Sequence, residues 1–343
     1  MTEAEDALAP RERGWLSVCF ALLLVLVLPA TPLLRIVFPI DQTMLLLVPT
    51  LAMFAVTGWR VGGRWSLALF WLVLAVWVLW QPTRDATSFA LLARGWSVIV
   101  AATFGALTVF GVGERFLHRA LMSLAIACGL SALIALIAAG GPQAVLDVFT
   151  DEIASRAANS QAQWQQMTGT SEWLEFIASN PNAQKLADEV SRQMSVLPTA
   201  GILLFPSLLA LESLAALAVG WAIYHRVGRA RVGPPLARWR DLRFDDALIW
   251  GIIAGLVIVV LPLTGMVRSV GVNLLVFFGA LYAMRGMGVL IWFLAPGRWT
   301  VVFLTIFTLL FWHVVGLVAV AIGIGDTWFD WRRRSRPKSQ RSE

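Results

Sequence analysis

The sequence has little charge and few of the side chains that enzymes use for catalysis. Only 14% of its 343 residues are charged, whereas a soluble domain carries roughly a quarter. Cys19 and Cys128 both lie in apolar stretches and do not indicate a disulfide framework. The three histidines are scattered and lack metal-ligand spacing. Because the sequence has no phosphate loop, HExxH zinc motif or Ser/His/Asp set, we expect no enzyme activity, no metal and no cofactor.

What the sequence has in abundance is apolar surface. Apolar residues make up 58% of the chain, and the mean hydropathy is +0.74. Stretches of about 20 uncharged residues can cross a hydrocarbon layer ~30 Å thick, since a helix rises about 1.5 Å per residue. They predict an all-α, polytopic transmembrane helix bundle with about eight crossings. The apolar segments run over residues 15–38, 43–57, 65–80, 88–112, 116–139, 199–223, 246–267, 270–295 and 299–324.

Arginines near the ends of the apolar segments set the expected orientation, because basic residues beside a span stay in the cytoplasm. They are Arg60, Arg64, Arg115, Arg119 and the arginines of the loop 224–244. The rule places these loops and the amino terminus inside, and it places the acidic segment 140–198 outside. We therefore expect a multi-pass protein of a bacterial inner (plasma) membrane, with both termini in the cytoplasm.

The predicted organisation alternates membrane bundles with polar segments. It comprises a cytoplasmic tail (1–14), an N-terminal transmembrane bundle of about five helices (15–139), an external amphipathic helical segment (140–198), a C-terminal transmembrane bundle with the basic loop 224–244 (199–326) and a basic cytoplasmic tail (327–343). Within the external segment we predict short helices over Ser171–Ala178 and Asn182–Met194, the second because Leu186, Val190 and Met194 share a face at four-residue steps. These helices either lie on the membrane surface or cap the bundle, or they merely connect two spans.

A conflict arises at the carboxyl terminus of the chain. The arginine-rich tail demands the cytoplasm, but three crossings after the basic loop would place it outside. One apolar segment must therefore not cross. We predict a broken or re-entrant helix over 270–295, because Arg285 lies near its middle beside Gly286 and Gly288, and glycine disfavours a continuous helix. The alternative is that the positive-inside rule fails at the tail.

Two ionisable residues lie near the middle of predicted spans, where a charge is costly without a partner. They are Glu212 and Arg285. We predict that the two form an ion pair, with His313 or Asn273 nearby, in a polar interior between the later helices. Such an interior would bind a small polar substrate, or the pair would lock two helices together without any ligand.

Acids and arginines also meet where the last span reaches the cytoplasm. The residues are Asp326, Asp330, Arg332 and Arg333. Two acids four positions apart share a helical face and can pair with the arginines that follow. We predict that these residues stabilise the end of the helix at the membrane interface. They would also serve as a docking site for a partner.

Several runs of the sequence resemble the YybS-like family of bacterial polytopic membrane proteins of unknown function (domain of unknown function 2232). They are Leu281–Val289, Gly325–Arg333 and Arg243–Asp246 with Trp250. That family is thought to be distantly similar to the S components of energy-coupling-factor vitamin transporters. The run Gly58–Gly62 looks like the cytoplasmic turn of such an S component. The resemblance implies capture of a small molecule for uptake, with energy from separate ATPase subunits; it assigns no ligand-contacting residue.

Two classes of function follow from these patterns. In the first, the protein binds a small polar molecule and helps to translocate it in the manner of a transporter S component, through Glu212, Arg285, Asn273 and His313. In the second, it is a non-transporting scaffold or interaction protein of the cell envelope. The lipid bilayer is the expected partner in both cases. The net charge of +6 lies at span ends and in one loop, so we expect no nucleic-acid partner.

Overall fold

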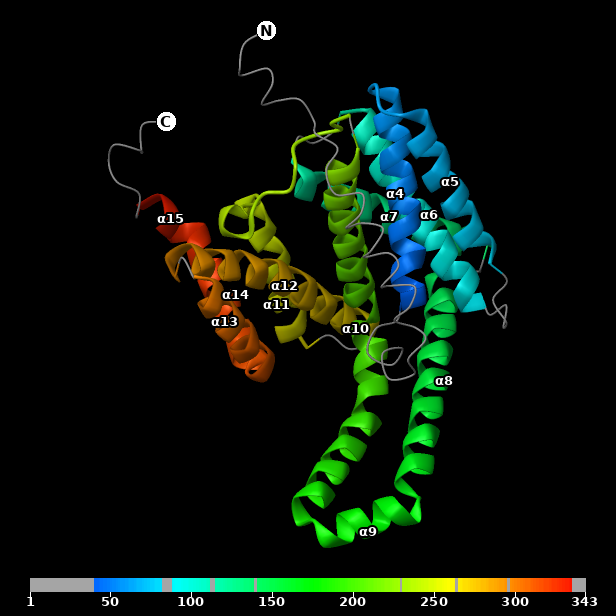
Figure 1. Ribbon diagram of the computed structural model, residues 1–343, viewed down its shortest axis with the longest axis vertical. Helices are drawn as coiled ribbons and strands as arrows, with labels where there is room; N and C mark the ends of the chain where they lie inside the picture. Colours follow the sequence, from blue (N-terminus) through cyan, green and yellow to red (C-terminus); the bar gives the residue numbers. More distant parts are fainter. Residues whose placement is uncertain are drawn as a thin grey trace. The chain divides into compact units, whose positions relative to one another are not determined.

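The computed structural model describes residues 40–81, 88–111, 115–138, 141–228, 230–262, 265–294 and 297–334. Regular structure in these residues is helical throughout (Figure 1), which confirms the all-α class. The predicted tail 1–14, the predicted span 15–38 and the end of the basic tail lie outside them. The chain forms two compact units. Unit 1 comprises 1–112 with 120–232, and unit 2 comprises 113–119 with 233–343.

Among the described residues, four helices are long and apolar enough to cross a membrane. They are Ser88–Val109, Phe116–Ala138, Pro198–Val227 and Met266–Leu294. A bent pair of helices near the carboxyl terminus raises the number to five if it counts as one span. The expected total of about eight crossings stays a prediction.

Unit 1 is built around α4 (Ile40–Arg60). This helix contacts α5 (Trp65–Trp80), α6 (Ser88–Val109) and α10 (Pro181–Val227), and α7 (Phe116–Ala138) adds a further apolar helix from residue 120 onward. Phe54 of α4 is fully buried and meets Phe104 and Trp221 edge to face, with ring centroids 5.2 and 5.3 Å apart. Edge-to-face contacts favour one fixed arrangement, so these three rings hold α4, α6 and α10 in register.

Several polar side chains inside unit 1 bond to one another or to their own helix. The hydroxyl oxygens of Thr103 and Ser123 lie 2.8 Å apart, and Trp96 Nε1 donates to Ser213 Oγ at 2.9 Å. Thr50 donates to the carbonyl of Leu46 one turn earlier. Small hydroxyl residues allow membrane helices to approach closely and bond across the contact.

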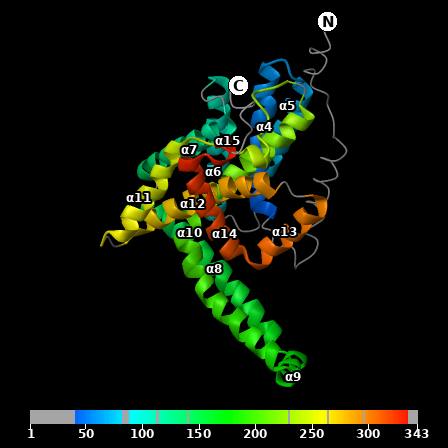
Figure 2. The same ribbon diagram turned by 90° about the vertical axis from the view of Figure 1, so that its left-hand side faces the viewer.

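A long helical hairpin belongs to unit 1 as well. It consists of α8 (Pro142–Thr168), the short α9 (Ser171–Ser179) and the first half of α10 (Figures 1 and 2). Trp164 Nε1 of α8 donates to Ser191 Oγ of α10 at 3.0 Å. Thr170 and Asn180 cap the amino termini of α9 and α10. At 1.5 Å per residue, α8 alone is about 40 Å long.

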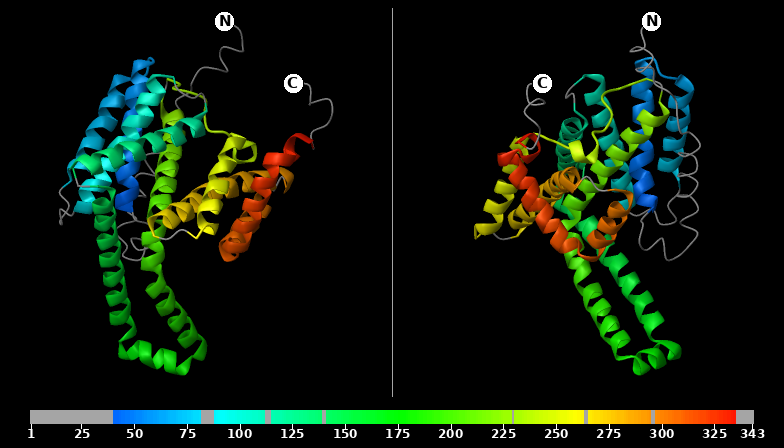
Figure 3. Two further views of the ribbon diagram at one scale, coloured as in Figure 1. Left: turned by 180° about the vertical axis from the view of Figure 1, so that it is seen from behind. Right: turned by 60° about the vertical axis from the view of Figure 1, so that its left-hand side comes forward.

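The hairpin confirms one predicted helix and corrects another. The helix predicted over Ser171–Ala178 is α9, but the helix predicted over Asn182–Met194 does not end before the span. It continues through Pro198 and Pro206 as the 47-residue α10. The residues of α10 change from polar to apolar along the helix. This change marks the point where the surroundings of the helix change from water to lipid. The hairpin extends away from the other helices of unit 1 (Figure 3). Its expected place outside the membrane stays a prediction, and so do its alternative roles as a surface helix pair, a cap or a connection between two spans.

Unit 2 is arranged around α12 (Met266–Leu294). This helix contacts α11 (Ile249–Val260), α14 (Trp312–Phe329) and the 3₁₀ turn η2 (Trp239–Asp241). Glycines make these contacts close. Gly286 lies against the carbonyl of Ala319, and Gly323 lies against the carbonyl of Tyr282, so that a Cβ at either glycine would collide with backbone. The turn η3 (Asp246–Leu248) precedes α11, and the remaining elements are α13 (Arg298–Leu310) and α15 (Trp331–Arg334).

The prediction of a broken helix over 270–295 is wrong, because α12 runs unbroken for 29 residues. Its glycines serve packing: Gly286 admits α14, and Gly288 admits the carbonyl of Trp239. The interruption falls in the next apolar segment, predicted as a single span over 299–324. There the pair Val302–Thr308 and His313–Phe329 is bent by 106°.

Candidate functional site

Arg285 is the centre of a buried ion cluster in unit 2. Only 6% of its side chain is exposed. Its Nη1 donates to Asp246 Oδ1 at 2.7 Å, and its Nε donates to Asp326 Oδ2 at 3.1 Å. The guanidinium carbon also lies over the Phe244 ring, 5.3 Å from the ring centre. One side chain on α12 thus joins the residue that begins η3 to the last turns of α14.

Asp326 and Arg332 complete this cluster at the end of α14. Asp326 Oδ2 also accepts from Arg332 Nη2 at 2.7 Å, and the two side chains are 0% and 2% exposed. Arg332 Nη1 donates to the backbone carbonyls of Arg240 and Leu242 at 3.1 and 3.0 Å. The segment around η2 is therefore bound to the chain's last described helix.

The local backbone explains how Arg332 reaches Asp326. α14 ends at Asp330, whose φ of 40° and ψ of 54° lie in the left-handed region. Aspartate is one of the few residues with a side chain that adopt this conformation readily. The turn that it makes redirects the chain into α15, so that Arg332 folds back over the end of α14.

A second, more exposed ion pair lies beside the cluster. Arg243 Nη2 donates to Asp330 Oδ1 at 2.8 Å, with 41% and 37% of the two side chains exposed. In the cluster itself, the charges of Arg285 and Arg332 are balanced by those of the buried Asp326 and of Asp246, whose side chain is 61% exposed. A buried charge is stable only with such partners, so the chemistry that this arrangement performs best is to hold segments together.

The structure gathers the motif residues of the last span only in part. Asp326 pairs with Arg332, one of the arginines that follow it, but Asp330 pairs with Arg243 from far earlier in the chain. The side chain of Arg333 lies outside the described ones. The sequence prediction assumed that both acids pair with neighbours along one helix. The left-handed turn at Asp330 ends that helix, so Asp330 does not share its face.

The predicted neighbours Asn273 and His313 do not join Arg285. Asn273 lies 12 residues before Arg285 on the same continuous helix, which separates them by about 18 Å along the axis. Its Nδ2 donates to the carbonyl of Ser269 at 2.8 Å. His313 is exposed near the start of α14, 13 residues and roughly 20 Å along the helix from Asp326. The sequence interpretation placed these residues together in one polar interior between the later helices.

Glu212 lies half-buried in α10, near the middle of the span Pro198–Val227. Its neighbour Ser213 accepts the hydrogen bond from Trp96. Glu212 itself has no hydrogen bond or ion pair within the described part of the chain. Both acids that bind Arg285 belong to its own unit, so this arginine does not need Glu212. Their pairing stays a prediction.

The sequence interpretation missed Asp246 and Arg243 as members of the cluster. A signal for them existed, because Arg243–Asp246 places three charges directly before the apolar α11. Nothing local indicates that the partners of these charges lie 39 and 87 residues away.

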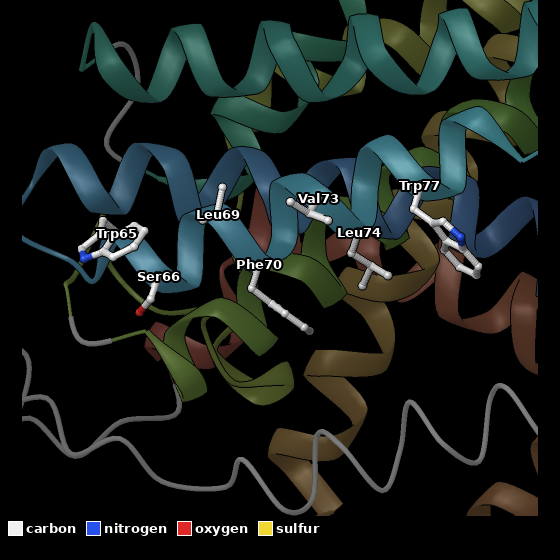
Figure 4. Close-up of a pocket in the computed structure, with 7 residues that line it drawn as sticks. All are labelled: Trp65, Ser66, Leu69, Phe70, Val73, Leu74 and Trp77. Atoms are coloured by element: carbon white, nitrogen blue, oxygen red, sulfur yellow. The ribbon is translucent and has the colours of Figure 1, made fainter.

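A shallow groove along α5 is apolar (Figure 4). Its volume is about 480 Å³. It is lined by one face of a single helix: Trp65, Ser66, Leu69, Phe70, Val73, Leu74 and Trp77. This groove differs from the closed polar cavity that a small polar ligand would require, and its composition suits contact with lipid chains.

Comparison with known proteins gives one match. The model of a family described as a predicted membrane protein (DUF2232) matches residues 18–327. This confirms the family resemblance seen in the sequence, while the YybS-like name and the similarity to transporter S components stay predictions. No curated protein and no solved structure matches the chain.

Proposed function

Since the chain belongs to the DUF2232 family of predicted membrane proteins, we propose that it is a non-transporting membrane scaffold. In this proposal, unit 2 holds the segment 238–246 and the end of α14 together as one fixed surface for a partner. The observation that carries it is the double ion pair of Arg285, which binds Asp246 and Asp326 at once.

The balance of charge in the cluster favours a lock over a ligand site. Removing one member of a buried ion pair leaves an uncompensated charge, at a cost of about 3–5 kcal/mol. A ligand that displaced Asp326 from Arg285 and Arg332 would have to repay that cost before it gained any affinity. A cluster in which both guanidinium groups already have an ion pair with Asp326 is better suited to permanent contact.

The same contacts support the placement of the basic loop and the tail on one side of the membrane. Arg243 bonds Asp330, and Arg332 bonds the carbonyls of Arg240 and Leu242. Two segments that touch through polar groups lie on one side, so an even number of crossings separates them. The bent pair α13–α14 is our candidate for the apolar segment that does not cross. The predicted cytoplasmic position of both segments agrees with this.

The proposal is tested by photo-crosslinking in intact membranes. A photoreactive phenylalanine analogue replaces Trp328, which is exposed next to the cluster. We expect a discrete adduct that is lost in Arg285→Gln, because the surface loosens, and retained in the control Arg192→Gln on the hairpin. Asp246→Asn, which changes the exposed end of the cluster, serves if Arg285→Gln does not fold. The scaffold proposal would be overturned by a metabolite that raises the thermal stability of the wild-type protein but not that of Asp246→Asn.

A second candidate function is favoured by Glu212. A carboxyl group at mid-span with no partner among the described residues is, by default, a sign of a functional site. It agrees with what the resemblance to S components implies, namely binding of a small polar molecule and coupling to separate ATPase subunits. In a thermal-shift screen, a ligand at 100 times its Kd adds about 2.7 kcal/mol of stability. A shift lost in Glu212→Gln but kept in Glu189→Gln would support this function, and a shift unaffected by either change would remove Glu212 from it.

A further inference from the structure

Three consecutive side chains of unit 2 project from the basic loop into solvent. Arg238, Trp239 and Arg240 are all exposed, the indole of Trp239 to 59% and the side chain of Arg240 to 56%. Burying an indole is favourable, so an exposed one between two arginines calls for a partner that offers both apolar contact and negative charge.

The backbone beneath these side chains is held in place. The amide of Asp241 donates to the Arg238 carbonyl at 2.8 Å, which closes the turn η2. Arg332 binds the Arg240 carbonyl, and the Trp239 carbonyl packs against Gly288 of α12. A fixed backbone removes part of the ordering entropy that binding would otherwise cost.

Positive charge is available at this turn. Arg238 has no ion pair or hydrogen bond from its side chain to any residue that the structure describes. Arg240 reaches only Asp241, at 3.6 Å and with both side chains exposed, which is a weak pair. Of the other nearby acids, Asp246 pairs with Arg285, Asp330 pairs with Arg243, and Asp245 accepts a hydrogen bond from the Ala247 amide. The two guanidinium groups of η2 can therefore receive an anion.

Aromatic residues extend the same surface. Trp328 and Phe329 are exposed at the end of α14, directly before Asp330, which bonds Arg243. Tryptophan beside arginine is the combination found where a membrane protein meets lipid headgroups. Inorganic phosphate would account for the arginines, but it would leave these aromatic groups without a role. The bases of an RNA strand stack on such rings, so RNA is one of the competitors in the test below.

We propose that Arg238, Trp239 and Arg240 bind the phosphate of an anionic phospholipid in the leaflet that faces the basic loop. The guanidinium groups hold the phosphate oxygens through charge-assisted hydrogen bonds, and the indole lies at headgroup level among the upper lipid chains. This inference does not rest on the scaffold role, because a bound lipid would serve a transporter equally.

The test measures binding of fluorescent phosphatidylglycerol to the purified full-length protein in a neutral detergent. Arg238→Gln/Arg240→Gln should weaken binding on the order of 30-fold, from the attraction lost with two basic residues at an anionic surface. Trp239→Ala should weaken it less. The matched control Arg156→Gln/Arg192→Gln removes the same charge from the hairpin and should leave binding unchanged.

Competitors distinguish the possible sources of the phosphate. Phosphatidylcholine, inorganic phosphate and a short RNA are each added to the wild-type complex. We expect none of them to displace phosphatidylglycerol at concentrations where unlabelled phosphatidylglycerol does. Equal binding by the double variant and the control would overturn the proposal, and so would full displacement by inorganic phosphate or by RNA. Thermal unfolding of each variant confirms that it is folded.

Discussion

The two units of this chain keep polar side chains among apolar helices by different means. Unit 1 uses neutral groups, such as the Trp96–Ser213 and Thr103–Ser123 contacts, around a core of edge-to-face rings. Unit 2 uses full charges, with Arg285 and Arg332 sharing Asp326. Neutral hydrogen bonds tolerate the loss of one partner far better than buried ions do. The comparison teaches that unit 2 is the more vulnerable to a single change of charge.

The largest expected effect comes from Asp326→Asn. This change leaves two buried guanidinium groups sharing a neutral amide, so it should lower the free energy of unfolding of unit 2 by about 3–5 kcal/mol. Chemical unfolding in detergent micelles measures it.

Asp330→Asn is the matched control for Asp326→Asn. It alters an exposed pair at a position where asparagine also adopts the left-handed backbone, and the expected cost is about 0–1 kcal/mol. Equal losses in the two variants would show that burial does not decide the strength of these ion pairs.

Close backbone contact in unit 2 is tested by Gly286→Ala. A Cβ there would meet the carbonyl of Ala319, so α12 and α14 would have to separate, with an expected destabilisation of about 1–3 kcal/mol. Thermal unfolding measures the change. Gly279→Ala on the same helix has nothing within 4 Å of the added methyl group and should be neutral or slightly stabilising. If both variants behave alike, the glycines of α12 are not packing residues.

Among the variants that remove a buried contact, the smallest effect is expected in unit 1, from Ser213→Ala. The change removes the acceptor for the Trp96 indole N–H while keeping the shape of the side chain, and it should cost about 1 kcal/mol in the same unfolding experiment. Ser195→Ala, whose hydroxyl bonds only within its own helix, is the control and should cost less. A loss for Ser213→Ala as large as that for Asp326→Asn would remove the contrast between the two units.

The sequence was sufficient for the features that depend on local pattern. Apolar length predicted the helices that became α5, α6 and α7, and the short helix predicted over Ser171–Ala178 became α9. The sequence interpretation placed the helix break of unit 2 in the wrong apolar segment. Glycine beside a buried arginine indicates a break only where no neighbouring residue packs against the glycine and no acid pairs with the arginine. Here Ala319 approaches Gly286, and Asp246 with Asp326 neutralises Arg285.

The candidate site shows the same limit. Arg285 was singled out because a charge within an apolar run is conspicuous, and Asp326 because it and Asp330 share a helical face before a run of arginines. Their pairing was not foreseen, since Asp326 lies 41 residues beyond Arg285 and the left-handed turn that positions Arg332 depends on one backbone angle. Contacts of this kind are fixed by tertiary packing, which a single sequence does not display.

The unbroken course of α10 has a mechanical consequence. A rod of 47 residues is about 70 Å long, and a rod turns as a whole, so a sideways push on its tip beside α9 swings its far end in the opposite direction. Only Pro198 and Pro206, which withhold an amide hydrogen from the helix ladder, offer points where it can flex. Both prolines lie between the hairpin tip and Glu212, so bending at the tip is taken up there before it reaches the depth of Glu212.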